Sequence, residues 1–141
     1  MSSTVMTLEE RQAFLAAVHV GIIAINEDGR GPLAVPVWYS YEPGGEVNVL
    51  MQSDSRKMVG IDAAGRFSLC AQTEEAPYKY VTVEGPVSAV RTYDQEDLLA
   101  MATRYLGEEM GRQYAASGPG ANSVMVSMTP EHWLSTDYSK R

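Results

Sequence analysis

The sequence predicts a mainly β, α+β fold, an antiparallel barrel of six strands with two flanking helices. Three observations carry this prediction. Residues 33–41 alternate cleanly between an apolar and a mixed face, which is typical of a half-buried strand. Similar segments recur along the chain with only short turns between them, which favours antiparallel sheets. Helical periodicity appears only before the first strand and late in the chain, so a parallel sheet with alternating helices is not expected.

The six strands are expected at residues 20–25, 33–41, 46–52, 66–73, 78–90 and 123–128. In the fifth of them, Gly85 and Pro86 indicate a bulge or bend. Residues 43–45 form a Pro-Gly-Gly turn, which predicts a hairpin between the second and third strands. A loop is expected at residues 117–120, and a single domain over residues 1–141.

Two helices are expected beside the strands. Thr7 and Glu10 form a capping box for a first helix that should end near His19. Asp94 can cap a second helix that continues through Tyr105, where apolar residues repeat at helical spacing.

Composition excludes several classes of function. The net charge of −7 argues against a nucleic-acid partner, because such proteins need a basic stripe. No apolar run is long enough for a membrane span, and one cysteine cannot form an internal disulfide, so the cytoplasm is the expected location. His19, His132 and Cys70 lack the spacing of metal ligands, so no metal site is predicted. Cys70 lies in an apolar run and is expected to be an inert buried thiol.

The segment 53–58, Ser-Asp-Ser-Arg-Lys-Met, is the most informative motif. It follows a strand and begins a short helix that should end near Gly60 or Gly65. A helix N-terminus offers unpaired N–H groups, and the segment adds Ser53, Ser55, Arg56 and Lys57 as donors. Bound phosphate is one interpretation. The other is a serine-capped helix with two solvated cations.

Two aromatic segments suit the ring of a cofactor. Pro36 cannot donate to a sheet ladder and marks an edge or bulge, where free backbone groups and Trp38 could border a flat heteroaromatic ring. The alternative is an edge proline beside a packed tryptophan. Tyr78 and Tyr80 share a strand face, where they either line a pocket or pack across the barrel. No set of side chains supports catalysis by itself, so a cofactor is expected to carry any reaction, and the catalytic residues stay unknown.

The order of these motifs resembles the flavin/deazaflavin oxidoreductase superfamily, the pyridoxamine 5′-phosphate oxidase-like split β-barrel proteins. The resemblance covers nearly the whole chain: residues 19–25 with the following Asp-Gly turn, 34–39, 53–57, 80–86, 104–107 and Trp133. It implies a homodimer with two cofactor sites at the subunit interface and a small-molecule substrate. The expected cofactor-binding residues are Val35, Pro36, Val37, Trp38, Gln52, Ser53, Ser55, Arg56, Lys57, Tyr78, Lys79, Tyr80 and Trp133, with residues 78–80 and Trp133 contributed by the partner.

The short build is similar to the actinobacterial branch that uses the deazaflavin coenzyme F420. The resemblance therefore implies an oxidoreductase that transfers hydride from F420 to a conjugated acceptor such as a quinone, an enone or biliverdin. The C-terminus lacks the tryptophan-and-arginine pattern of pyridoxamine-phosphate oxidases, so that activity is not expected. Two alternatives stay open: an FMN-dependent oxidoreductase or oxidase of the same fold, and a non-catalytic flavin-, deazaflavin- or heme-binding protein.

Overall fold

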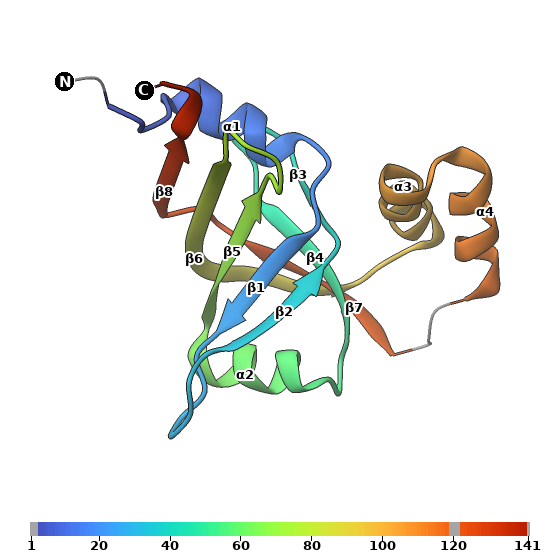
Figure 1. The fold of residues 1–141 in the computed structure, drawn as a ribbon. Coiled ribbons are helices and arrows are strands. Elements are labelled where there is room, and N and C mark those ends of the chain that lie inside the picture. Colours follow the sequence, from blue (N-terminus) through green and yellow to red (C-terminus); the bar gives the residue numbers. More distant parts are fainter. Residues whose placement is uncertain (1–2, 119–121, 141) are drawn as a thin grey trace.

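The computed structural model describes residues 3–118 and 122–140 as a curled antiparallel sheet with helices around it (Figure 1). The strands are β1 (Gly21–Ile25), β2 (Leu33–Val37), β3 (Tyr39–Tyr41), β4 (Val47–Gln52), β5 (Arg66–Gln72), β6 (Lys79–Thr92), β7 (Ser123–Met128) and β8 (His132–Asp137). The helices are α1 (Leu8–Ala16), α2 (Arg56–Ala64), α3 (Gln95–Leu106), α4 (Glu108–Ser117) and the short 3-10 helix η1 (Tyr138–Lys140). None of the described helices is both long and apolar enough to cross a membrane.

The two end strands of the sheet are joined by a covalent connection rather than by a ladder of hydrogen bonds. The strand order is β2-β1-β5-β6-β7-β4-β3, and β8 pairs with β6 beside this path. Strands β2 and β3 therefore lie at opposite ends of the order, yet only Trp38 separates them in sequence. The long strand β6 joins the two halves, since its first part pairs with β5 and β8 and its second part with β7. This arrangement confirms the predicted antiparallel split barrel.

The core fills the interior of the curled sheet. Its side chains come from alternate positions of the strands, as the period of two requires. Among the fully buried ones are Tyr39, Ile23, Leu69, Val83 and Val126. Figure 1 shows α1 across one end of the barrel and α2 across the other, while α3 and α4 stand to one side.

The predicted element counts were wrong in three places. The strand expected over residues 33–41 is two strands, because the chain passes from one sheet edge to the other at Trp38. Strand β8 is an additional strand at residues for which no strand was expected, and it pairs with β6. A further helix, α4, follows α3, because Gly107 adopts a φ of 85° and starts a new helix instead of only ending the old one.

Two other boundaries also differ from expectation. Helix α1 ends at Ala16, before His19, and the capping box of Thr7 and Glu10 is present as predicted. The irregularity expected at Gly85 and Pro86 lies just beyond them, where the β6–β7 register shifts between Val87 and Ala89. Part of the loop expected at residues 117–120 lies outside the described residues.

The hydroxyl of Tyr105 holds the closure point in place. It accepts a hydrogen bond from the N–H of Tyr39 (3.0 Å) and lies 2.6 Å from the carbonyl oxygen of His19 and 3.0 Å from that of Tyr39. The neighbouring Arg104 donates to the carbonyls of Ala16 (3.0 Å) and Ala17 (2.9 Å) at the end of α1. Helix α3 is thereby fixed against the barrel where β2 becomes β3.

Replacing Tyr105 by phenylalanine should destabilise the protein. The change leaves the Tyr39 N–H without its partner, and an unsatisfied buried donor costs about 1–3 kcal/mol. Urea denaturation of the variant measures this loss. Tyr114→Phe is the matched control, because Tyr114 also contacts Trp38 but is more exposed. Equal stabilities of the two variants would show that the Tyr105 hydroxyl does not hold the closure.

Replacing Gly85 by alanine should also destabilise the fold. A Cβ atom at this position would overlap the carbonyl oxygen of Thr129 and lie 3.2 Å from the amide nitrogen of Glu131. Relieving such a clash shifts backbone, so we expect a loss of at least about 2 kcal/mol in the free energy of unfolding. Gly31→Ala serves as the control, since nothing lies within 4 Å of its Cβ position. An unchanged denaturation midpoint for Gly85→Ala would contradict the packing.

Candidate functional site

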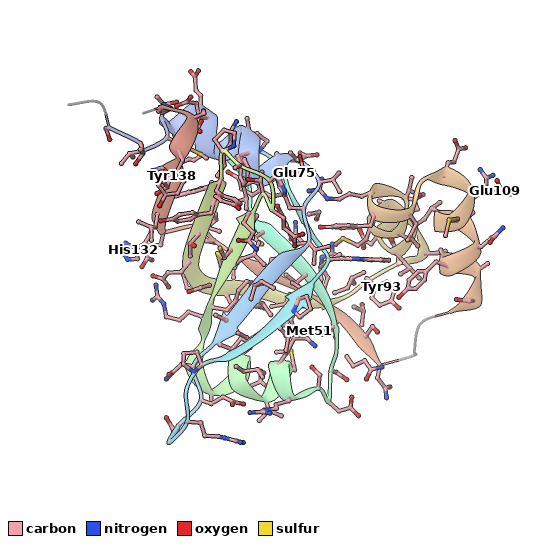
Figure 2. The ribbon with its side chains drawn as sticks, in the orientation of Figure 1. Met51, Glu75, Tyr93, Glu109, His132 and Tyr138 are labelled. Atoms are coloured by element: carbon pink, nitrogen blue, oxygen red, sulfur yellow. The ribbon has the colours of Figure 1, made fainter. Side chains whose placement is uncertain are left out.

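A cavity of about 330 Å³ lies between the barrel and the α3–α4 pair, above the start of α2. Its lining combines apolar residues of β2 and the α3–α4 region with polar residues of β4 and α2. The lining residues are Pro36, Val37, Trp38, Leu50, Met51, Gln52, Lys57, Tyr93, Leu98, Met101, Tyr114 and Ser123. In Figure 2, Tyr93 lies between the barrel and the two helices. The volume is within the range of small-molecule sites in proteins.

The apolar wall of the cavity is an aromatic stack. The ring of Trp38 lies parallel to that of Tyr105, with centroids 5.0 Å apart and an interplanar angle of 5°. Tyr114 of α4 contacts the same indole at 5.4 Å in a tilted arrangement. A second cavity of about 340 Å³ continues past this wall and is lined by Val20, Pro36, Val37, Trp38 and Tyr114. The wall therefore borders two adjoining spaces, and the lining of the second is mainly apolar.

The polar end of the cavity lies at the start of α2. Ser55 is the N-cap, and its hydroxyl accepts the N–H of Met58 at 3.2 Å. The helix ends at Gly65, which adopts a left-handed φ of 73°. The backbone N–H groups of Arg56 and Lys57 have no acceptor within the helix, as at any helix start. The half-buried Lys57 is the one lysine among the described residues that line the cavity.

Arg56 is engaged elsewhere. Its Nε donates to Oε2 of Glu27 at 2.9 Å and its Nη2 to Oε1 at 2.6 Å. This two-point pair ties the start of α2 to the turn between β1 and β2. The hydrogen bonds from Arg56 lower the pKa of Glu27, so its carboxylate stays ionised at neutral pH.

The structure brings together only part of the predicted site. Pro36, Val37, Trp38, Gln52 and Lys57 line the cavity. Val35 turns into the core instead, and the backbone N–H of Ser53 donates to Asn122 at 2.7 Å. The site residues that sequence reasoning missed are those supplied by β4, β7, Tyr93 and the α3–α4 pair: Leu50, Met51, Tyr93, Leu98, Met101, Tyr114 and Ser123. Their apolar spacing indicated packing but gave no signal of a cavity.

The remaining predicted residues lie on other parts of the chain. Tyr78 and Tyr80 stand at the start of β6, and Nζ of Lys79 is 3.9 Å from a carboxylate oxygen of Asp137. The ring of Trp133 packs inward, in edge contact with Tyr41 and beneath the guanidinium of Arg11. None of these four residues lines the cavity of its own chain. Their role in the site stays a prediction.

One cluster outside the cavity has the composition of a metal site. Glu84, Glu131 and His132 present ligand atoms within 4.8 Å of one another, because β8 pairs with β6. Figure 2 shows His132 at the outer edge of the sheet. However, Arg66 donates to both carboxylates, at 2.8 and 2.9 Å to Glu84 and 3.0 Å to Glu131. The guanidinium of Arg66 already occupies oxygens of both carboxylates and offsets one of their two negative charges, so no metal is assigned to the group.

Comparisons with known proteins identify the fold. No family model and no curated protein sequence matches the chain. Among solved structures, a conserved hypothetical protein from Mycobacterium tuberculosis is similar with a TM-score of 0.77 and 20% identity, over 98% of this chain and 89% of that one. A protein titled F420 reductase matches with a TM-score of 0.72 and 18% identity, over 87% and 94%. An FAD-binding protein from Mesorhizobium loti matches with a TM-score of 0.64 and 19% identity, over 93% and 94%.

These similarities extend over most of each chain at low sequence identity, so they establish architecture rather than activity. They agree with the resemblance carried by the sequence motifs. The chain therefore shares the split β-barrel fold of these solved structures.

Proposed function

We propose that this protein is an oxidoreductase that binds a flavin-type cofactor in the cavity between Trp38 and Lys57. The observation that carries the proposal is the polarity of the cavity: an aromatic wall at one end, and a lysine beside a helix N-terminus at the other. A tricyclic ring with a phosphorylated side arm has the same polarity. The phosphate would lie at the N–H groups of Arg56 and Lys57 and the Lys57 ammonium, where the helix dipole favours an anion.

The aromatic wall and the strand edge would hold the ring. Strand β2 is the end strand of the sheet order, and Pro36 cannot donate to a ladder there, so backbone groups remain for the rim of a heteroaromatic ring. Trp38 is fixed by its stack on Tyr105 and would set the plane of the ring. The reduced cofactor supplies hydride when bound. The chain itself orients the two reactants and excludes water, which is a large part of catalysis in reactions of this kind.

Coenzyme F420 is the first candidate for the cofactor. The adjoining apolar cavity at Val20 and Tyr114 fits a flat conjugated acceptor such as a quinone, an enone or biliverdin. The similarity in fold to a structure titled F420 reductase supports this choice. FMN is the second candidate, because the site offers few cations for the polyglutamate tail of F420. Titration of the purified protein with each cofactor, followed by fluorescence, separates the two, and binding without oxidation of reduced cofactor by any acceptor would indicate a carrier instead.

We also propose a homodimer that buries the outer face of the sheet. Register places one row of residues across five strands: Pro36, Ile22, Cys70, Thr82 and Leu134. Ile22 is 37% exposed and Leu134 is 61% exposed, so the row presents apolar surface to solvent in a single chain. Such a row is a typical interface. Because Pro36 belongs to both the row and the cavity, a second copy on this face would border the cofactor.

The same face carries two of the residues assigned to the partner, the tyrosines at positions 78 and 80. Tyr78 and Tyr80 share the parity of Thr82 along β6, whereas Val81 and Val83 point into the core. Tyr78 is 53% exposed. In the proposed dimer these tyrosines of one copy would approach the cavity of the other. The cytoplasmic location expected from composition is part of the same proposal.

Replacing Lys57 by glutamine should weaken cofactor binding. A charge-assisted hydrogen bond contributes about 1.5–3 kcal/mol, which corresponds to roughly ten- to hundred-fold in the dissociation constant. Fluorescence titration with F420 and with FMN measures the change. Lys140→Gln is the control, since that lysine pairs with Glu10 and lies outside the cavity lining. An affinity for both cofactors that Lys57→Gln leaves unaltered would remove the phosphate from this position.

Replacing Leu134 by glutamate should dissociate the dimer. The change places a charge at the β8 end of the apolar row, where its burial in the proposed interface is unfavourable. Light scattering coupled to size-exclusion chromatography should report a dimer for the unmodified protein and a monomer for the variant. Val59→Glu is the control, because Val59 is similarly exposed (65%) but lies on α2. A monomeric unmodified protein would refute the interface.

A further inference from the structure

The ion pair between Glu27 and Arg56 changes the charge that the start of α2 presents. Glu27 lies in the turn after β1, and Arg56 is the first residue of α2. Both guanidinium–carboxylate contacts are short, at 2.9 and 2.6 Å, and form the two-point geometry that fixes an arginine most strongly. The Glu27 side chain is only 15% exposed, whereas that of Arg56 is 55% exposed.

The pair leaves Lys57 as the cation available to an anion in the cavity. Arg56 contributes one positive charge, Glu27 one negative charge and Lys57 one positive charge, so these three side chains sum to a single positive charge. Lys57 lines the cavity and forms no ion pair with any residue in the described part of the chain. Arg56 and Glu27 are absent from that lining.

We propose that Glu27 is a specificity-determining residue: by holding Arg56 it sets the site for a phosphate with one negative charge. This inference rests on the proposed function and deepens it. A phosphodiester carries one negative charge, and a phosphomonoester carries about 1.5 to 2 at neutral pH. The phosphate of F420 is a diester, and that of FMN is a monoester. Because Glu27 pairs with Arg56, a monoester dianion finds only one cation at the site and binds less favourably than it would with two. Glu27 therefore favours the diester by disfavouring the competing monoester.

The two members of the pair have opposite effects on the charge at the site. Removing only Glu27 frees Arg56 and raises the sum to two positive charges. Removing only Arg56 leaves an unpaired carboxylate beside the site and lowers the sum to zero. Removing both returns the sum to one. A double-mutant cycle over these two positions therefore distinguishes two explanations. In one, the pair only sets the charge of the site, and in the other, Arg56 contacts the phosphate directly.

The experiment titrates F420, FMN and riboflavin into the unmodified protein and into Glu27→Gln, Arg56→Gln and the double variant. Glu27→Gln should tighten FMN binding at least about five-fold and F420 binding by less, because the dianion gains more from the freed guanidinium. Riboflavin has no phosphate, so its affinity should stay within about two-fold of the original value across all variants. Arg56→Gln should weaken both phosphorylated cofactors, and the double variant should bind them as the unmodified protein does.

Two results would overturn the inference. One is an FMN affinity that Glu27→Gln leaves unchanged, and the other is a double variant that binds as weakly as Lys57→Gln, which would mean that Arg56 contacts the phosphate. Glu108→Gln removes another arginine-paired glutamate, that of α4, and should change nothing. Thermal denaturation verifies that each variant is folded. If the unmodified protein and all variants bind none of the three probes, the proposed function fails instead, so the two failures are distinguishable.

Discussion

The structure depends on how the curled sheet is closed at Trp38. Strands β2 and β3, which lie at the two ends of the strand order, are joined there by a single residue. Within the described residues no ladder of hydrogen bonds connects them. A split of this kind leaves backbone groups that need partners, and the Tyr105 hydroxyl supplies one for Tyr39. The same contact brings α3 against the barrel and stacks Tyr105 on Trp38. The same contacts of Tyr105 therefore close the sheet and form the aromatic wall of the cavity.

The positive charge at the polar end of the cavity, opposite the aromatic wall, is low. The chain carries a net charge of −7, yet it directs the half-buried Lys57 to the cavity. Glu27 lies in the connection between β1 and β2, beside α2. Its carboxylate pairs with the guanidinium of Arg56 and so keeps Arg56 out of the cavity lining. The proposed site combines helix N–H groups with Lys57, which forms no ion pair with the residues that the structure describes. In the proposed function, discrimination between anions would follow from this charge balance rather than from a shape that excludes one of them.

Local signals in the sequence predicted local structure well. For α2 the sequence offered two serines as the start and two glycines as the end, and the caps are Ser55 and Gly65 from those pairs. Asp94 caps α3 as predicted, because capping depends on residues close in the chain. The break at Trp38 could not be predicted, since Val37 and Tyr39 point inward from both strands and preserve the alternation. The pair of Glu27 and Arg56 was also missed, because tertiary structure joins positions 29 residues apart. For the same reason the motif could predict an anion site at the start of α2 but not that Arg56 would be paired with Glu27.

The most direct test of the central claim is a crystal structure of the protein with F420 bound. The account predicts the phosphate against the Lys57 ammonium and the first N–H groups of α2, with the deazaflavin ring beside Pro36 and Trp38 and Arg56 still paired with Glu27. A ring bound away from Trp38, or a phosphate on another cation such as Lys79, would contradict it.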